Sequence, residues 1–372
     1  MGKILAAKPS ITQLEIDYVN DAIVNGWGDN CYDYIDKFNI QVKNYFNVRH
    51  VWPTSSCHGA LHMVLMALGV GPGDEVIVPD ATWVGSVFPI NWLGAIPVFA
   101  DVLQSTWCID PEKIEEKITN NTKAIIAVHL YGNLCEMDEI QAIGKKYGLT
   151  VIEDAAEALG AEYKGKKAGA IADFGVFSFH GTKTVTTGEG GVIISNRDDM
   201  AEKLTVIDSQ GRKPGARFFW VDEIGLKYKM SNIQAAIGTA QFKRANELVG
   251  GKRKIFNWYK EGLIDLEDIQ INQEQVDVKN SYWMPTIIFG NSWCMDQEKR
   301  DRLIDSMNTI GISLRPFFYP VSSFPMYENV TRNKISYRLS CSGINLPSFH
   351  DMIKKDVQFV VENLIDYFER VK

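Results

Sequence analysis

Seven short apolar segments alternate with helix-like stretches between residues 50 and 195, and no other feature constrains the fold as strongly. Several are almost uninterrupted apolar runs, such as "DEVIVP" (74–79) and "KAIIAVHL" (123–130), as expected of strands covered on both faces. In the stretch 59–70, apolar residues recur at helical spacing. The alternation predicts a mostly parallel seven-stranded sheet flanked by helices. The predicted strands are 50–55, 74–79, 96–102, 123–130, 149–154, 174–179 and 190–195.

The chain changes character after about residue 230. A long amphipathic helix is predicted over 232–249, and the patterns that follow indicate a smaller α+β unit. These patterns are a helical stretch at 252–263, a strand at 281–289 and helices at 297–311 and 354–371. We therefore expect a large α/β domain over residues 1–250 and a small C-terminal domain over residues 251–372.

Charge and cysteine content exclude several classes of protein. The net charge of −7 argues against nucleic acid or an anionic membrane as the main partner. The N-terminal stretch has no apolar run long enough for a signal peptide or a membrane span. The six cysteines are scattered without a CxxC pair, so we expect neither a disulfide framework nor a metal site. A cytoplasmic protein is predicted.

Two charged residues follow predicted strands, where open α/β sheets bind their ligands. Asp154 closes the strand 149–154 and either caps a helix in "AAEALG" or faces a cationic ring nitrogen. Lys183 lies in "SFHGTKTVTTGEGG" (178–191) among small, uncharged neighbours. It is either a solvated loop lysine or an amine that loses its proton and forms an imine with an aldehyde.

Other residues at the same edge have two interpretations each. Ser178 is a turn former or a donor to a phosphate. Ser56 caps the helix that follows it, or the amides of Ser56, Cys57 and His58 bind a phosphate at the helix N-terminus. Trp83 is a core residue or stacks on a flat ring. Together, the functional interpretations describe one ligand, pyridoxal 5′-phosphate (PLP). A nicotinamide dehydrogenase is disfavoured because no GxGxxG follows a first strand.

The motifs "VIEDAAEALGAEYKGKKAGAIADFGVFSFHGTKTVTTGEGGVIISN", "GPGDEVIVP", "KAIIAVHLYG", "YKMSNIQAAIG" and "GINLPSF" resemble the PLP-dependent sugar aminotransferases of the DegT/StrS type. Within that family they are most similar to the GDP-perosamine synthase branch. The resemblance implies a fold-type I PLP-dependent transferase, related in fold to aspartate aminotransferase. It also implies a homodimer with active sites at the subunit interface.

The resemblance also implies roles for individual residues. Lys183 would form the Schiff base with the cofactor, and Asp154 would pair with its ring nitrogen. Glu157 would lie near the ring hydroxyl, where many relatives have Gln, and Trp83 would stack on the ring. The phosphate would be held by Ser178, by the amides of Ser56, Cys57 and His58, and by Asn232 of the partner subunit.

The expected reaction moves an amino group from L-glutamate to a keto-sugar, here a nucleotide-linked 4-keto-6-deoxy sugar, for amino-sugar and lipopolysaccharide synthesis. Arg212, Lys213 and Arg217 lie within six residues of one another and either form a solvated face or hold a diphosphate. The expected substrate contacts are His180, Arg212, Arg217, Lys229 and Arg315.

Several alternatives stay open, among them other PLP chemistry on this fold, decarboxylation or desulfuration. The acceptor could be an oxidised sugar acid, such as an octulosonate with an oxidised terminal carbon, which would yield an 8-amino-3,8-dideoxy sugar acid. A PLP-dependent sugar dehydratase of this fold would have histidine in place of Lys183. A PLP-binding regulator would have lost catalysis.

Overall fold

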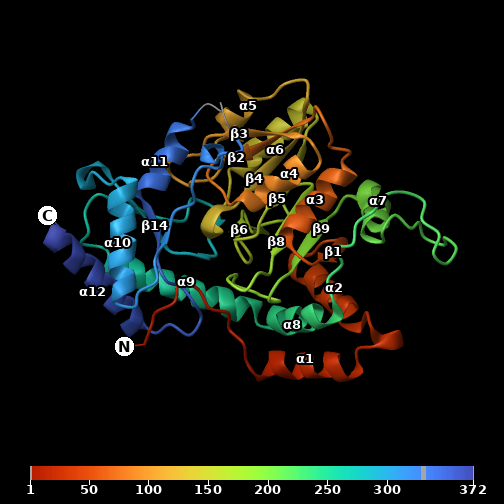
Figure 1. Cartoon of the computed structure of the whole chain (residues 1–372), viewed down its shortest axis with the longest axis horizontal. Helices are drawn as coiled ribbons and strands as arrows, with labels where there is room; N and C mark the ends of the chain where they lie inside the picture. The colour runs from red at the N-terminus through yellow and green to blue at the C-terminus, as the bar shows by residue number, and fades with distance from the viewer. Residues whose placement is uncertain (1, 328–331, 372) are drawn as a thin grey trace.

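The computed structural model describes residues 2–327 and 332–371, and a seven-stranded sheet forms its centre (Figure 1). The strand order is β1-β9-β8-β5-β4-β2-β3. The strands from β8 to β3 are parallel, whereas β9 is antiparallel to both of its neighbours. The mostly parallel sheet is therefore confirmed. Its strands are β1 (His50–Thr54), β2 (Glu75–Pro79), β3 (Ile96–Ala100), β4 (Thr122–Val128), β5 (Thr150–Asp154), β8 (Phe174–Ser178) and β9 (Gly191–Ser195).

Helices cover both faces of this sheet because the strand residues are apolar on both sides. In β2, Val76 and Val78 belong to one buried cluster, with helices α3, α4 and α7, while Ile77 belongs to the other, with α2, α6 and α8. The helices of this region are α1 (Gln13–Asn25), α2 (Asp33–Phe46), α3 (Cys57–Ala67), α4 (Phe88–Trp92), α5 (Pro111–Glu115), α6 (Met137–Tyr147), α7 (Asp198–Asp208) and α8 (Asn232–Lys243). Single 3₁₀ turns occur at Gly28–Asn30, Val84–Ser86, Leu130–Gly132, Asn291–Trp293 and Val321–Ser323.

A second, antiparallel sheet has the order β10-β12-β14-β13 and its own apolar core. The N-terminal residue Ile4 joins this core and bridges to Ile312. Three short strands form a separate small sheet, β11-β6-β7. The remaining elements are β6 (Glu162–Tyr163), β7 (Lys166–Lys167), α9 (Ala245–Gly262), β10 (Ile269–Ile271), β11 (Val278–Lys279), β12 (Thr286–Phe289), α10 (Gln297–Thr309), β13 (Arg315–Pro316), α11 (Lys334–Ser342), β14 (Gly343–Asn345) and α12 (Lys354–Val371).

Two predicted elements differ from the structure. The helix predicted over 232–249 is two helices that meet at Arg244, whose backbone angles (φ −105°, ψ 3°) leave the helical range. The strand predicted over 281–289 is limited to β12, because Trp283 and its neighbours form an irregular segment. In the part of the chain described, no helix has both the length and the apolar content needed to cross a bilayer.

Candidate active site

The pairing of β1, β8 and β9 brings the residues around Ser178 together at one edge of the candidate site. Ser178 and Thr54 both pair with Gly191, so these three residues are lateral neighbours at the edge of the sheet. A Cβ on Gly191 would lie 2.6 Å from the Cys57 amide nitrogen, so only glycine lets β9 approach the first turn of α3 this closely. Ser56 caps α3 by accepting a hydrogen bond from Gly59 N (3.1 Å). The Ser178 hydroxyl and a capped helix N-terminus therefore lie at one edge, an arrangement suited to an anion.

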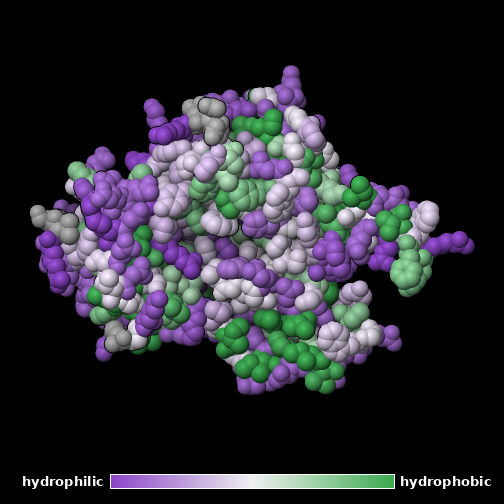
Figure 2. Space-filling view, viewed as in Figure 1, coloured by the Kyte–Doolittle hydropathy of each residue, from purple (hydrophilic) through white to green (hydrophobic). Residues whose placement is uncertain are grey.

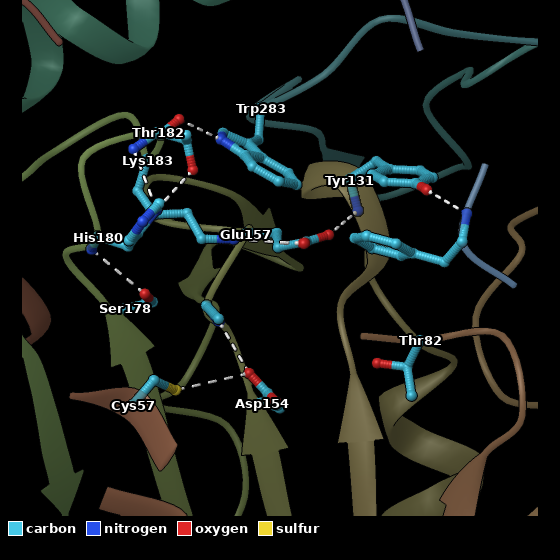
Figure 3. Close-up of polar contacts among 12 residues, drawn as sticks. Cys57, Thr82, Tyr131, Asp154, Glu157, Ser178, His180, Thr182, Lys183 and Trp283 are labelled. Carbon is cyan, nitrogen blue, oxygen red and sulfur yellow. Dashed lines mark hydrogen bonds and ion pairs between the residues drawn. The ribbon is translucent and has the colours of Figure 1, made fainter. Parts of the chain in front are cut away.

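Asp154 provides a buried carboxylate at the end of β5 and is only 4% exposed. Its oxygens accept hydrogen bonds from Ser86 Oγ (2.7 Å) and Ala156 N (3.1 Å), and the Cys57 thiol lies 4.0 Å away (Figure 3). Residues 155–160 form turns, so the helix-capping interpretation is wrong. No ion pair neutralises Asp154 among the described residues. A buried carboxylate without a cation is costly, so this position suits a cationic ring nitrogen.

Lys183 lies in the loop after β8, and its side chain is only 13% exposed. The Nζ atom is 3.3 Å from Glu157 Oε1 and 3.7 Å from the ring centre of Trp283. Glu157 Oε2 accepts a hydrogen bond from Tyr131 N (2.8 Å). Burial raises the pKa of Glu157, and the nearby Lys183 charge partly opposes that rise. The lysine is thus an enclosed amine beside a carboxylate, and the solvated-loop interpretation does not hold.

Four aromatic rings form a row from Lys183 to the exposed Trp83. Trp283 stacks on Tyr131, with ring centroids 6.2 Å apart and 26° between the ring planes. Tyr131 stacks in the same way on Phe318, at 5.2 Å and 29°. Phe318 in turn lies 5.9 Å from Trp83. Trp83 is 55% exposed, so it is not a core residue and its ring is free to stack on a ligand.

Sequence analysis missed Trp283, Tyr131 and Phe318. Tyr131 follows β4 in "HLYG", so the rule that polar and aromatic residues at strand ends form the site would have found it. Trp283 and Phe318 lie in irregular segments distant in sequence, and no local pattern points to them.

Two predicted histidines lie in the same region. His58 stacks on Trp92 (6.0 Å, 28°), and burial lowers its pKa. A Cβ on Gly85 would lie 2.9 Å from the His58 ring, so the His58 side chain is closely enclosed. His180 Nδ1 lies 2.9 Å from Thr182 Oγ1, and its Nε2 lies 3.6 Å from Glu189 Oε1. His180 is therefore held beside the Lys183 loop.

The predicted basic contacts lie on separate segments of the chain, and β13 brings the charge of Arg315 near Tyr131. Arg212 and Arg217 are exposed on the segment that protrudes beyond α7 (Figure 1). Lys229 forms an ion pair with Asp208 (3.0 Å), and burial raises the pKa of Asp208. Arg315 lies in β13 and makes no ion pair within residues 2–327 and 332–371.

Asn232 begins α8 and contacts its own chain. Its side-chain oxygen accepts a hydrogen bond from Tyr34 N (2.9 Å). Its predicted contact reaches the site of a second subunit, so it stays a prediction.

The residues fit a cofactor that combines an aldehyde, a protonated ring nitrogen, a flat face and a phosphate. Lys183 is an enclosed amine, Asp154 is a buried carboxylate that lacks a cation, and Trp83 offers an exposed ring. The edge at Ser178 offers a hydroxyl group and helix amides. The fold and this site define a PLP-dependent aminotransferase.

Comparisons with known proteins agree with this assignment to the PLP-dependent aminotransferases. The model of the DegT/DnrJ/EryC1/StrS aminotransferase family matches residues 9–365. The chain is 40% identical to a GDP-perosamine synthase of Escherichia coli O157:H7 over 99% of both chains, and 37% identical to one of Caulobacter vibrioides over 98% of both. Spr1654 of Streptococcus pneumoniae, assigned to the sugar aminotransferases and solved in its PLP form, superposes with a TM-score of 0.91 at 27% identity over the whole of both chains. The chain belongs to the DegT/DnrJ/EryC1/StrS aminotransferase family and is a PLP-dependent transaminase.

Proposed function

We propose that this transaminase moves the amino group of L-glutamate to the keto carbon of a nucleotide-linked 4-keto-6-deoxy sugar, in the synthesis of an amino sugar for lipopolysaccharide or O-antigen. The observation that carries the proposal is the near full-length similarity to GDP-perosamine synthases. The enclosed Lys183 amine supports aminotransfer over dehydration, since the related dehydratases have histidine there.

Lys183 is the proposed acid–base catalyst. When bound, PLP withdraws electrons from the α-carbon of the amino donor and makes its proton acidic. Lys183 Nζ takes that proton and later returns it, which the Glu157 carboxylate 3.3 Å away assists by holding the charged amine. Asp154 keeps the cofactor ring nitrogen protonated, and Ser86 and Ala156 hold the Asp154 carboxylate in place.

Trp83 would stack on the face of the cofactor ring. The phosphate would be held by Ser178 Oγ, by the amides of Ser56, Cys57 and His58, and by Asn232 of a second subunit. Homodimerisation is supported by four exposed apolar residues on and near α1, Ile16, Ile23, Val24 and Trp27. Figure 2 shows a hydrophobic patch over α1. A patch of this kind commonly marks a protein–protein interface.

The protruding segment after α7 is the proposed contact with the acceptor diphosphate. Arg212 and Arg217 lie on it together with exposed aromatic residues, Phe218, Phe219 and Trp220. In a chain with a net charge of −7, a local basic cluster suits an anionic substrate. His180, Lys229 and Arg315 complete the proposed substrate set. If Arg212→Ala and Arg217→Ala leave the acceptor KM unchanged, the segment does not bind the diphosphate.

The proposal also includes a cytoplasmic location and the division into a large and a small domain. All six cysteines are free, which suits a reducing cytoplasm. The division near residue 250 would fall within α9, which links the two apolar cores.

An acceptor assay tests the substrate class. Purified protein with PLP and L-glutamate is given GDP-, UDP- and dTDP-linked 4-keto-6-deoxyhexoses and an oxidised octulosonate in parallel. We expect 2-oxoglutarate and an amino sugar from a nucleotide-linked acceptor. The octulosonate alternative is not favoured by the relatives, and amination of the octulosonate alone would contradict the proposal.

A further inference from the structure

The Lys183 amine lies between the Glu157 carboxylate and the face of the Trp283 ring (Figure 3). Trp283 is 5% exposed and Glu157 is 7% exposed, so water has little access to the amine between them. A cation over an indole ring is attracted by the ring quadrupole, most strongly for tryptophan and away from water. The ring face and the carboxylate thus both offer the ammonium group an attractive contact.

Trp283 is held in place by its own hydrogen bonds. Its Nε1 donates to the Thr182 carbonyl oxygen (2.8 Å), next to Lys183 in the chain. Its own carbonyl oxygen accepts a hydrogen bond from the buried Lys252 Nζ (3.3 Å). The ring is further stacked on Tyr131. The ring orientation is thus set by the protein.

A close backbone contact explains how Trp283 reaches the site. Gly132 has a positive φ of 97°, and a Cβ there would lie 2.7 Å from Tyr282 N and 2.9 Å from Trp283 N. Ser281 N donates to the Gly132 carbonyl oxygen (3.1 Å). The loop after β4, which also positions Glu157 through Tyr131 N, is therefore locked to the segment containing Trp283.

We propose that Trp283 is a positioning residue for Lys183, which holds the ε-ammonium group against Glu157 whenever that amine is not bonded to the cofactor. This inference rests on the proposed role of Lys183. It assigns a function to a residue outside the cofactor contacts. The amine is then kept at one place, beside Glu157 and under the Trp283 ring, until it bonds to the cofactor.

The test is chemical labelling of Lys183 in the cofactor-free, full-length protein with trinitrobenzenesulfonate, followed by peptide mass spectrometry across a range of pH. Only the neutral amine reacts. In Trp283→Leu, the pH profile of labelling should move down by about one pH unit, equivalent to about a tenfold change in the ratio of amine to ammonium. Trp283→Phe keeps a weaker aromatic face, so its profile should move in the same direction by less.

Improved access alone would raise the labelling rate without moving the profile, and an unmoved profile would overturn the proposal. Trp293→Leu is the matched control, since that ring packs on Phe289 and Phe368 in the antiparallel-sheet core, and its profile should equal that of the wild type. If Trp283→Leu does not fold, the labelling profile of Trp283→Phe tests the proposal, and an unmoved profile in that variant overturns it. Borohydride reduction of the PLP-loaded protein shows separately which lysine bonds to the cofactor, so a failure of the Lys183 assignment is distinguished from a failure of the Trp283 role.

Discussion

The two buried carboxylates of the candidate site, Asp154 and Glu157, have different surroundings. Asp154 is bound by neutral donors and lacks a cation among the described residues, so it is prepared for a positive charge supplied by a ligand. Glu157 already faces the Lys183 amine, and burial raises its pKa. The surroundings of Asp154 therefore suit a cationic group of a ligand, whereas Glu157 already pairs with the lysine.

Asp154→Asn should lower kcat by at least about a hundredfold, because the amide cannot balance a protonated ring nitrogen and loss of a buried charge partner costs about 2–5 kcal/mol. The measurement is kcat with saturating L-glutamate and acceptor. Retention of PLP is followed by the absorbance of the protein.

Asp101→Asn provides the control. Asp101 is also a buried strand-end carboxylate, but it accepts hydrogen bonds from Ile335 N and Ser336 Oγ. Its replacement should lower the free energy of unfolding and leave kcat of the folded protein near the wild-type value. Equal kcat losses in the two variants would argue against a specific role for Asp154.

Only part of the candidate site could be predicted from the sequence, and the reason is physical. Asp154, Ser178 and Lys183 were identifiable because they follow buried strands, and parallel strands bring their carboxyl ends to one edge. Trp283 reaches the same place only through the packing of Gly132 against residues 281–283. A contact between segments about 150 residues apart leaves no periodic signal in either segment.

The junction of α8 and α9 shows the same limit at the scale of elements. The apolar periodicity of residues 232–249 is helical throughout, yet the helix is interrupted at Arg244. The Arg244 guanidinium donates to Glu15 Oε1 (3.0 Å) and Ser10 Oγ (2.9 Å), and Glu15 is 1% exposed. The break is associated with partners more than 200 residues away, which the local pattern does not contain.

Arg244→Ala should lower the free energy of unfolding by about 1–3 kcal/mol, because it leaves the buried Glu15 carboxylate with fewer donors. The measurement is urea denaturation. The neighbouring Lys243 is exposed, so Lys243→Ala should change stability by less than about 0.5 kcal/mol. Equal effects would contradict the role given to Arg244.

Lys252 makes stability depend on pH. Its amine is buried, and burial, followed by the charge of Arg315, lowers its pKa to about 7. Between about pH 7 and 10 the unfolded chain binds a proton there that the folded chain does not, so the free energy of unfolding rises with pH. Relative to Lys252→Met, the wild type should gain up to roughly 4 kcal/mol across this range. Parallel curves for the two proteins would contradict the lowered pKa.

At the scale of the whole molecule, the parallel strands of the central sheet were predictable. The contacts between segments distant in sequence were not. Apolar runs and intervening helices specified the parallel strands, because burial on both faces demands that composition. The antiparallel direction of β9 and the return of Ile4 to the C-terminal core depend on distant pairings. Neither produces a local pattern.

The exposed patch near α1 predicts the assembly. Trp27 is 64% exposed and Val24 is 73% exposed. A double variant, Val24→Asp with Trp27→Asp, should shift the proposed homodimer toward monomers. Activity should fall with it, because the proposed contact of Asn232 with the site of a second subunit would be lost. Sedimentation velocity measures the change. Val276→Asp alters an equally apolar position that is 89% exposed elsewhere on the chain, and it should leave the assembly unchanged.

The isolated half-reaction with L-glutamate tests most directly whether the protein is a transaminase that depends on Lys183. PLP-loaded protein, mixed with L-glutamate and no acceptor, should release one equivalent of 2-oxoglutarate per subunit and lose its imine absorbance. Adding the nucleotide-linked keto-sugar should restore that absorbance, and Lys183→Ala should do neither. Release of 2-oxoglutarate by Lys183→Ala at the wild-type rate, or none by the wild type, would contradict the account.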